Sequence, residues 1–138
     1  MSNRTFTIIK PDSVRKGNFG KIISRLETEG FRILGIKKVN LSRSEAEAFY
    51  GVHRERPFFG SLVEYMTSGT VYVAALERES AVPELRKLMG ATDPAKADAG
   101  TIRKEFGESI EQNAIHGSDS DENANIEISF FFAGTELL

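Results

Sequence analysis

The chain has 138 residues, of which 40% are apolar and 28% charged, a composition typical of a globular protein with enough residues for one core. Its formal net charge of -2 excludes the overall basic surface of a nucleic-acid-binding protein but leaves room for a local anion pocket, and the lack of cysteine excludes disulfides, thiol catalysis and thiolate metal sites. No segment approaches the roughly 20 apolar residues of a membrane span and the N-terminal residues lack a signal-peptide pattern, so we expect a single cytoplasmic domain over residues 1–138.

The first part of the chain alternates between strand and helix patterns. The β-favouring run Thr5–Ile9 predicts a strand that ends at Lys10, because the proline that follows cannot extend a sheet ladder. Apolar residues three, four and seven positions apart predict a helix over residues 18–29. Phe31–Leu41 then has the pattern of a second strand, in which Gly35 indicates a bulge or a close neighbour.

Two short helices are expected after the second strand. Ser42 and Glu45 match the S-x-x-E capping box and predict the start of a helix that runs through Tyr50. The Arg-Pro pair at 56–57 ends this helix, and another follows through Met66. Together they predict a helical hairpin.

The second half of the chain begins with a strand that we expect to be central in the sheet. Thr70–Leu76 is almost continuously apolar, which is typical of a strand buried on both faces. Ser80 is expected to cap a helix. Residues 90–112 are rich in breakers and predict a long functional loop. A short strand over 113–116 and a helix capped by Ser120 complete the pattern.

The order of these elements predicts the fold class. Helices alternate with strands, but several connections are too short for parallel crossovers, so antiparallel pairing is expected. We therefore predict an α+β fold, a ferredoxin-like split β-α-β sandwich. In this fold a four-stranded antiparallel sheet carries helices on one face, and a helical hairpin is inserted.

The stretch N-A-I-H-G-S-D at residues 113–119 carries one of the two histidines in the chain. Gly117 adds no bulk beside the His116 ring, while Ser118 and Asp119 supply a hydroxyl and a carboxylate that can fix its tautomer. Such a histidine can act as a base, a metal ligand or a nucleophile. The same residues are good turn and helix-cap material, so this stretch alone does not separate catalysis from a plain loop.

Side chains suited to a polyphosphate occur near the breaks between elements, at Lys10, Arg86, Thr92 and Arg103. The chain lacks both the P-loop and the dinucleotide-binding glycine patterns. The aromatic pair at 58–59 follows the break in the hairpin, where a ring can stack on a base. Taken singly, each of these residues is better interpreted as surface charge, a solvated strand end or core.

In combination, these residues match a known pattern. The whole chain resembles the nucleoside diphosphate kinase family through the motifs I-K-P-D (9–12), Y-x-x-H-x-x-R-P-F-F (50–59), M-G-A-T-D-P-A (89–95), G-T-I-R (100–103) and N-A-I-H-G-S-D-S (113–120). The last motif is highly specific where it follows a long loop and precedes a final helix. The resemblance implies transfer of the γ-phosphoryl group from a nucleoside triphosphate to a nucleoside diphosphate, by a ping-pong mechanism through a phosphohistidine and with broad base and sugar tolerance.

The resemblance also implies a role for each site residue. His116 is expected to be the nucleophile, oriented by Glu127 with Ser118 nearby, and Lys10 and Tyr50 are grouped with these catalytic residues. The expected substrate contacts are Lys10 and Asn113 to ribose hydroxyls and phosphates, Tyr50, Arg86, Thr92 and Arg103 around the phosphates, and Phe58 and Ile110 on the two sides of the base. Magnesium is expected to be held mostly by the nucleotide's phosphates. No metal ligand is assigned; Asp119 is the nearest candidate, although capping the final helix suits it better.

Two other classes of protein stay open. Ferredoxin-like sheets also bind RNA, but Tyr72 is the one visible aromatic candidate on a strand face, and nucleic acid is not an expected partner. A relative that has lost catalysis is disfavoured by the intact His116, Lys10 and Arg103. His53 is expected to be a surface residue of the hairpin.

The run Phe130–Phe132 near the end of the chain bears on assembly. Three consecutive apolar side chains cannot all point the same way, so an apolar patch is left for a partner. The second strand is also long enough to need its edge covered. Together with the resemblance, these features predict a homo-oligomer of two-fold dimers through the first helix and second strand. A tetramer is favoured over a hexamer because the tail is short.

Overall fold

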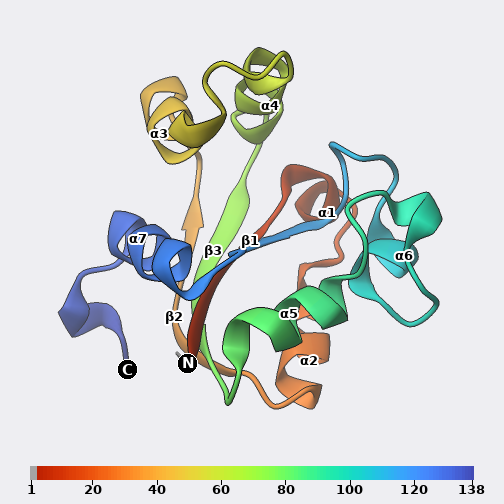
Figure 1. The fold of residues 1–138 in the computed structure, drawn as a ribbon, viewed down its shortest axis with the longest axis vertical. Coiled ribbons are helices and arrows are strands. Elements are labelled where there is room, and N and C mark those ends of the chain that lie inside the picture. Colours follow the sequence, from red (N-terminus) through yellow and green to blue (C-terminus); the bar gives the residue numbers. More distant parts are fainter. Residues whose placement is uncertain (1–2) are drawn as a thin grey trace.

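The computed structural model describes residues 3–138 and contains a four-stranded sheet (Figure 1). Its strands follow the order β2-β3-β1-β4 across the sheet, and every neighbouring pair is antiparallel. The strand bounds are β1 Arg4–Ile9, β2 Arg32–Val39, β3 Val71–Glu77 and β4 Ile115–Gly117. The predicted strands and the antiparallel α+β fold class are confirmed. The third strand is central in the sheet, as predicted.

Helices connect the strands and extend beyond them (Figure 1). The α-helices are α1 Pro11–Arg15, α2 Phe19–Thr28, α3 Arg43–Phe49, α4 Phe59–Met66, α5 Ala81–Met89, α6 Ile102–Phe106 and α7 Asp121–Phe131. Short 3-10 turns are η1 Gly51–His53, η2 Pro94–Lys96 and η3 Gly134–Glu136. The hairpin expected between the second and third strands is α3-η1-α4, which projects from one end of the sheet. Within residues 3–138, no helix combines the length and the apolar character needed to cross a bilayer.

The helices cover both faces of the sheet, so the expectation that they lie on one face was wrong. Along β3, Val73 and Ala75 pack in one core cluster with α7 and the hairpin, whereas Ala74 and Leu76 pack in a second cluster with α2 and α5. Successive strand residues point to opposite faces, so these two clusters lie on opposite sides of the sheet. The physical reason is in β1, whose residues Thr5–Ile9 are all buried and therefore need cover on both faces.

Local features of the sequence were mostly predictive. The capping box forms, because Ser42 Oγ accepts from Glu45 N at 3.1 Å while Glu45 Oε1 accepts from Ser42 N at 2.8 Å. Gly35 lies at a register shift in β2, and a Cβ there would be 3.0 Å from the Phe132 ring. Ser120 Oγ accepts from the third residue of α7, as its capping role requires.

Three local predictions need correction. Helix α1 was missed because Pro11 was considered only as a strand terminator, although proline is also well suited to the first turn of a helix. The predicted loop over residues 90–112 contains α6, which Thr101 caps by accepting from Lys104 N at 3.3 Å. Ser80 precedes α5 as expected, but its φ of 54° is left-handed and its side chain makes no cap hydrogen bond.

Candidate active site

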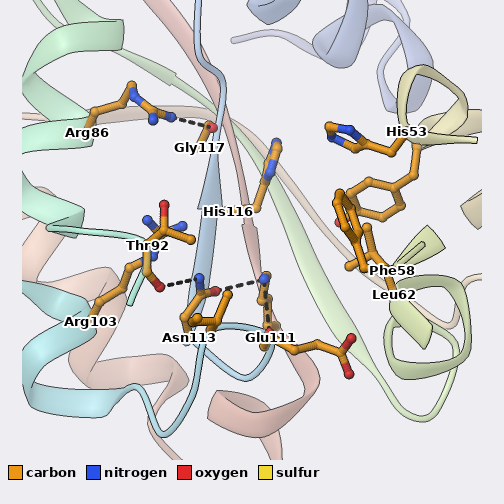
Figure 2. A pocket seen from close by; sticks show the side chains of 13 residues that line it. His53, Phe58, Leu62, Arg86, Thr92, Arg103, Glu111, Asn113, His116 and Gly117 are labelled. Carbon is orange, nitrogen blue, oxygen red and sulfur yellow. Dashed lines mark hydrogen bonds between the residues drawn. The ribbon is translucent and has the colours of Figure 1, made fainter. Parts of the chain in front are cut away.

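A cleft of about 480 Å³ opens beside β4, between the hairpin and the helices α5 and α6 (Figure 2). It brings together nine residues that the sequence had singled out: Lys10, Tyr50, Phe58, Arg86, Thr92, Arg103, Ile110, Asn113 and His116. In Figure 2 the arginines lie on one side, Phe58 on the other and His116 between them. Residues more than a hundred positions apart in the chain thus meet around one space.

The antiparallel register of β4 on β1 decides where His116 points. His116 pairs with Ile8, and paired residues of adjacent strands face the same side of a sheet. Gly117, next along the strand, faces the opposite side, where a Cβ would lie 2.5 Å from Met89 Sδ on α5. The glycine therefore lets α5 pack directly on β4, while His116 faces the side covered by the hairpin and α7.

The His116 ring is held by a carboxylate on α7. Its Nε2 lies 2.8 Å from Glu127 Oε1, and the Ser118 hydroxyl donates to the same oxygen at 2.8 Å. A carboxylate oxygen can only accept, so Nε2 carries the ring proton in this arrangement. The lone pair is then on Nδ1, which is the nitrogen left free for chemistry.

Aromatic rings surround the same imidazole. The ring centroids of Phe49, Phe6 and Tyr50 lie 5.7, 6.2 and 6.5 Å from that of His116, each in an edge-on arrangement. Burial, and secondarily the nearby Glu127, raises the pKa of the Tyr50 phenol. Its buried hydroxyl has no hydrogen-bond partner among residues 3–138, so it remains a proton donor beside the cleft.

Lys10 is a buried cation at the floor of the cleft. Its Nζ donates to Asn113 Oδ1 at 2.7 Å and to the Glu111 carbonyl at 3.2 Å. Burial, followed by the positive charge of Arg103, lowers its pKa from 10.5 to about 8. Asn113 in turn donates from Nδ2 to the Thr92 carbonyl at 3.0 Å, which connects the lysine to the far side of the cleft.

The two arginines add positive charge on the α5–α6 side. Arg103 is buried and donates to the carbonyls of Ile115 and Gly90 at 2.9 and 3.2 Å, while its Nε has no partner in the described chain. Burial, and then repulsion from Arg86, lowers the pKa of Arg103 to about 10. Neither arginine forms an ion pair with a carboxylate of residues 3–138, so their charge is available to an anion.

Apolar side chains form the outer part of the cleft. Phe58 is 46% exposed and Ile110 is 62% exposed, which is unusual for side chains of this size. Sequence reasoning missed Leu62 and Glu111, which also line the cleft, because neither stands out by type or spacing. His53 lines it too, with its ring centroid 5.4 Å from that of Phe58, so its description as merely a surface residue was incomplete.

Asp119, the nearest carboxylate candidate for a metal, has a structural contact. Its Oδ1 accepts from Asn123 Nδ2 at 2.6 Å, and this bond is the main cause of its lowered pKa. The hydroxyl of Ser120 caps α7, while Asp119 fixes a side chain in the first turn of that helix. Residues 3–138 contain no group of three or more His, Cys, Asp or Glu placed to hold a metal ion.

The sequence and the structure are similar to those of known proteins. The sequence model of the nucleoside diphosphate kinase family matches residues 3–137. The nucleoside diphosphate kinase of Granulibacter bethesdensis is 62% identical over 135 residues, which cover 98% of this chain and 96% of that protein. Among solved structures, an orthorhombic crystal form of the Aquifex aeolicus nucleoside diphosphate kinase has a TM-score of 0.97 and 45% identity, covering 100% of both chains.

A second solved structure carries a nucleotide. The halophilic nucleoside diphosphate kinase from Halobacterium salinarum, in complex with CDP, has a TM-score of 0.95 and 40% identity over 100% of this chain and 92% of that chain. Because the family match spans almost the whole chain and the relatives share its length, the protein belongs to the nucleoside diphosphate kinase family and is an enzyme that transfers phosphate between nucleoside triphosphates and diphosphates.

Proposed function

We propose that His116 carries the phosphoryl group between the two nucleotides. The Nδ1 lone pair attacks the γ-phosphorus of a bound triphosphate, and an Nδ1–P bond forms as the bond from phosphorus to the β–γ bridging oxygen breaks. The bonding electrons leave with the nucleoside diphosphate. In the second half-reaction a terminal phosphate oxygen of another diphosphate attacks the same phosphorus, and the Nδ1 lone pair returns to the ring.

The contact between His116 and Glu127 is the observation that carries this proposal. A proton on Nε2, accepted by the carboxylate at 2.8 Å, leaves the other ring nitrogen free and stabilises the positive charge that the ring gains on attack. Ser118 keeps the carboxylate in place through its own bond to the same oxygen. These two residues therefore orient the nucleophile.

Charge complementarity supports a polyphosphate in the cleft. Lys10, Arg86 and Arg103 bring three positive charges to the space beside His116. Phosphoryl transfer depends mainly on positioning and on neutralising charge. We assign the ribose hydroxyls and phosphates to Lys10 and Asn113, and the phosphates further to Tyr50, Arg86, Thr92 and Arg103.

The outer part of the cleft is suited to a nucleobase. We propose that the exposed ring of Phe58 stacks on the base and that Ile110 lies against its other side. A stacking ring contacts the π-face, which every base has, so broad base and sugar tolerance follows. The CDP complex of the Halobacterium salinarum enzyme supports a nucleotide in this fold.

We propose that the enzyme uses Mg²⁺ that arrives bound to the nucleotide's phosphates. The donor set of the cleft fits this role, because its polar groups are mainly cationic or neutral, and its Glu111 carboxylate already accepts from Ser61 Oγ at 2.8 Å. The ion neutralises phosphate charge when bound. Asp119, the carboxylate considered from the sequence, accepts from Asn123 Nδ2, and we assign it no direct bond to the ion.

The fold argues against the nucleic-acid alternative. Single-stranded RNA that binds on a ferredoxin-like sheet stacks on aromatic side chains of an open face, but helices cover both faces of this sheet. Tyr72, the aromatic that could have served, stacks on Phe19 of α2 with ring centroids 3.8 Å apart. We propose that nucleotides are the partners, in the cytoplasm, where they are supplied.

Steady-state kinetics test the two-step mechanism. Initial velocities measured against ATP at several fixed concentrations of a diphosphate acceptor should give parallel double-reciprocal lines, because the first product leaves before the second substrate binds. Intersecting lines would instead indicate direct transfer in a ternary complex and would refute the role of His116 as carrier.

A further inference from the structure

The chain enters β4 through a strained turn over residues 113–115, whose last residue is the first of the strand. Ala114 has φ of 77°, which few non-glycine residues adopt, and Ile115 N donates to the Asn113 carbonyl at 2.9 Å across it. A turn closed between residues i and i+2 around a central residue of positive φ is the rarer and more strained form of γ-turn. Such strain persists only where the surrounding structure enforces it.

The segment that follows β1 supplies that enforcement. Both polar groups of Ala114 are held by residues of this segment. Its carbonyl accepts from Lys10 N at 3.0 Å and from Ser13 Oγ at 3.1 Å. Its N–H donates to Asp12 Oδ2 at 3.1 Å. The strained residue is therefore clamped from one direction, by residues 10–13.

Asp12 is itself anchored on the hairpin. Its carboxylate is completely buried, and its other oxygen accepts a hydrogen bond from the hydroxyl of Tyr65 on α4. The backbone N–H of Asp12 donates back to the same hydroxyl at 2.8 Å. Helix α4 also carries Leu62, which lines the cleft, so one carboxylate joins the hairpin side of the cleft to the turn.

The turn controls two residues of the reaction. It holds Asn113 where the side chain bridges Lys10 and the Thr92 carbonyl, at 2.7 and 3.0 Å. Two residues later, it delivers His116 into register with Ile8, with the imidazole toward the cleft. Relaxation of Ala114 to negative φ would redirect the chain at the point between these two side chains.

We propose that Asp12 is a positioning residue for phosphoryl transfer. Its buried carboxylate, anchored by Tyr65, holds Ala114 in the γ-turn and thereby fixes His116 relative to Asn113 and Lys10. Asp12 does not line the cleft. The inference rests on the proposed role of His116 as nucleophile.

The test compares single-turnover rates of protein labelling by ATP in four variants. Asp12→Ala should slow labelling about ten- to a hundredfold, as small displacements of reacting groups do. Asp12→Asn should stay within about fivefold of the wild-type rate, because its amide oxygen can still accept from Ala114 and its amide nitrogen can donate to Tyr65. Glycine at position 114 adopts positive φ without support from Asp12. In the Ala114→Gly background, the factor by which Asp12→Ala slows labelling should therefore be smaller by about fivefold or more.

A stability control separates positioning from general destabilisation. Leu76 is fully buried at the far end of β3, opposite Thr5, and Leu76→Ala should lower the melting temperature without slowing labelling. The proposal would be overturned if Leu76→Ala slowed labelling as much as Asp12→Ala does. It would also be overturned if Asp12→Asn labelled as slowly as Asp12→Ala. The third contrary result is that Asp12→Ala slows labelling by the same factor in the Ala114→Gly background. If Asp12→Ala yields no folded protein, Tyr65→Phe takes its place in the same cycle.

The His116→Ala variant separates the proposed role of His116 as nucleophile from the proposed positioning role of Asp12. If labelling persists in that variant, the proposed nucleophile is wrong. If labelling requires His116 but Asp12→Ala labels at the wild-type rate, the nucleophile stands and the positioning role of Asp12 fails.

Discussion

Lys10 holds its charge in a place that water reaches poorly. Burial and the neighbouring Arg103 lower its pKa to about 8, so the free enzyme carries this charge below that pH and loses it above. An ammonium group donates to a phosphate oxygen at about 2.7–2.9 Å, and the proposed phosphate contact therefore needs the protonated form of Lys10. Burial lowers the pKa of Lys10 in the free enzyme. It also leaves the ammonium group poorly solvated, so little water has to be displaced when an anion binds.

We expect kcat/KM to fall above about pH 8, approaching a tenfold loss per pH unit, since kcat/KM reports ionisations of the free enzyme. Lys10→Arg provides the control: its charge does not titrate in this range, so the fall should move to higher pH in whatever activity it retains. A wild-type profile that is flat to about pH 10, or a fall that Lys10→Arg leaves in place, would contradict the assignment.

Unfolding does not explain such a fall. The pKa of Lys10 is below its ordinary value of 10.5 in the folded state, so between about 8 and 10.5 the unfolded chain binds more protons than the folded one. The contribution of this group to the free energy of unfolding therefore rises with pH across that window. Its loss of charge stabilises the fold, whereas the proposed phosphate contact of Lys10 requires the charge.

The helices and strands that were predicted correctly are marked by signals within their own stretch of sequence. The apolar run of β3 and the capping box of α3 are local signals that indicated their elements correctly. Helix α1 has five residues and starts with a proline, whose effect depends on whether the chain continues as strand or helix. The cover on both sheet faces depends on which helix packs where, which local pattern does not specify.

That these residues meet around one cleft followed from the resemblance and only partly from local pattern. Single residues such as Arg86 and Thr92 looked like ordinary surface groups, because their meeting depends on the packing of α5 and on the loop after it. The pairing of His116 with Ile8 is a long-range register that spacing does not encode. Asp12 belongs to the I-K-P-D motif, but no role was assigned to it, since the function of a buried carboxylate depends on partners that the sequence does not reveal.

Phe58, on the hairpin, is proposed to stack on the base, and its replacement tests this contact. Phe58→Ala should raise KM for the diphosphate by about five- to 150-fold, from a stacking contribution of about 1–3 kcal/mol per base. The increase should be similar for purine and pyrimidine, and wild-type enzyme should accept ribo- and deoxyribonucleotides within modest factors. KM and kcat measured for several diphosphates give the comparison.

Val52→Ala is the matched control on the same hairpin, because Val52 is 86% exposed and does not line the cleft. It should leave KM unchanged. Strict use of one base by the wild-type enzyme would show that a group reads the edge of the base, and Glu111 would then be the first residue to replace.

The folded chain leaves some apolar surface uncovered. Of the three closing phenylalanines, Phe132 is buried and Phe131 stacks on Phe6 with centroids 5.5 Å apart, but Phe130 is 40% exposed. On the edge strand β2, Leu138 N donates to the Leu34 carbonyl at 2.8 Å, so the tail covers part of the edge. Ile36 on the same strand is nevertheless 41% exposed.

We propose that β2 and α2 form a two-fold dimer and that dimers assemble further, with a tetramer favoured over a hexamer. Light scattering coupled to size exclusion should give about four times the 15.3 kDa chain mass at micromolar concentration. Ile36→Glu should shift the mass downward, because it would bury a charge in the dimer. A 15.3 kDa particle refutes assembly, whereas a hexamer refutes only the preference for a tetramer.

The proposed mechanism depends on a covalent phosphohistidine at His116, and a labelling experiment detects this intermediate. Incubation with γ-labelled ATP and no acceptor should label the protein stoichiometrically. The label should be lost in acid and kept in alkali, as expected of a phosphorus–nitrogen bond. His116→Ala should abolish both label and turnover, whereas His53→Ala, which removes the other histidine of the chain, should still be labelled. Label that survives in His116→Ala, or wild-type protein that turns over without any label, would contradict the account.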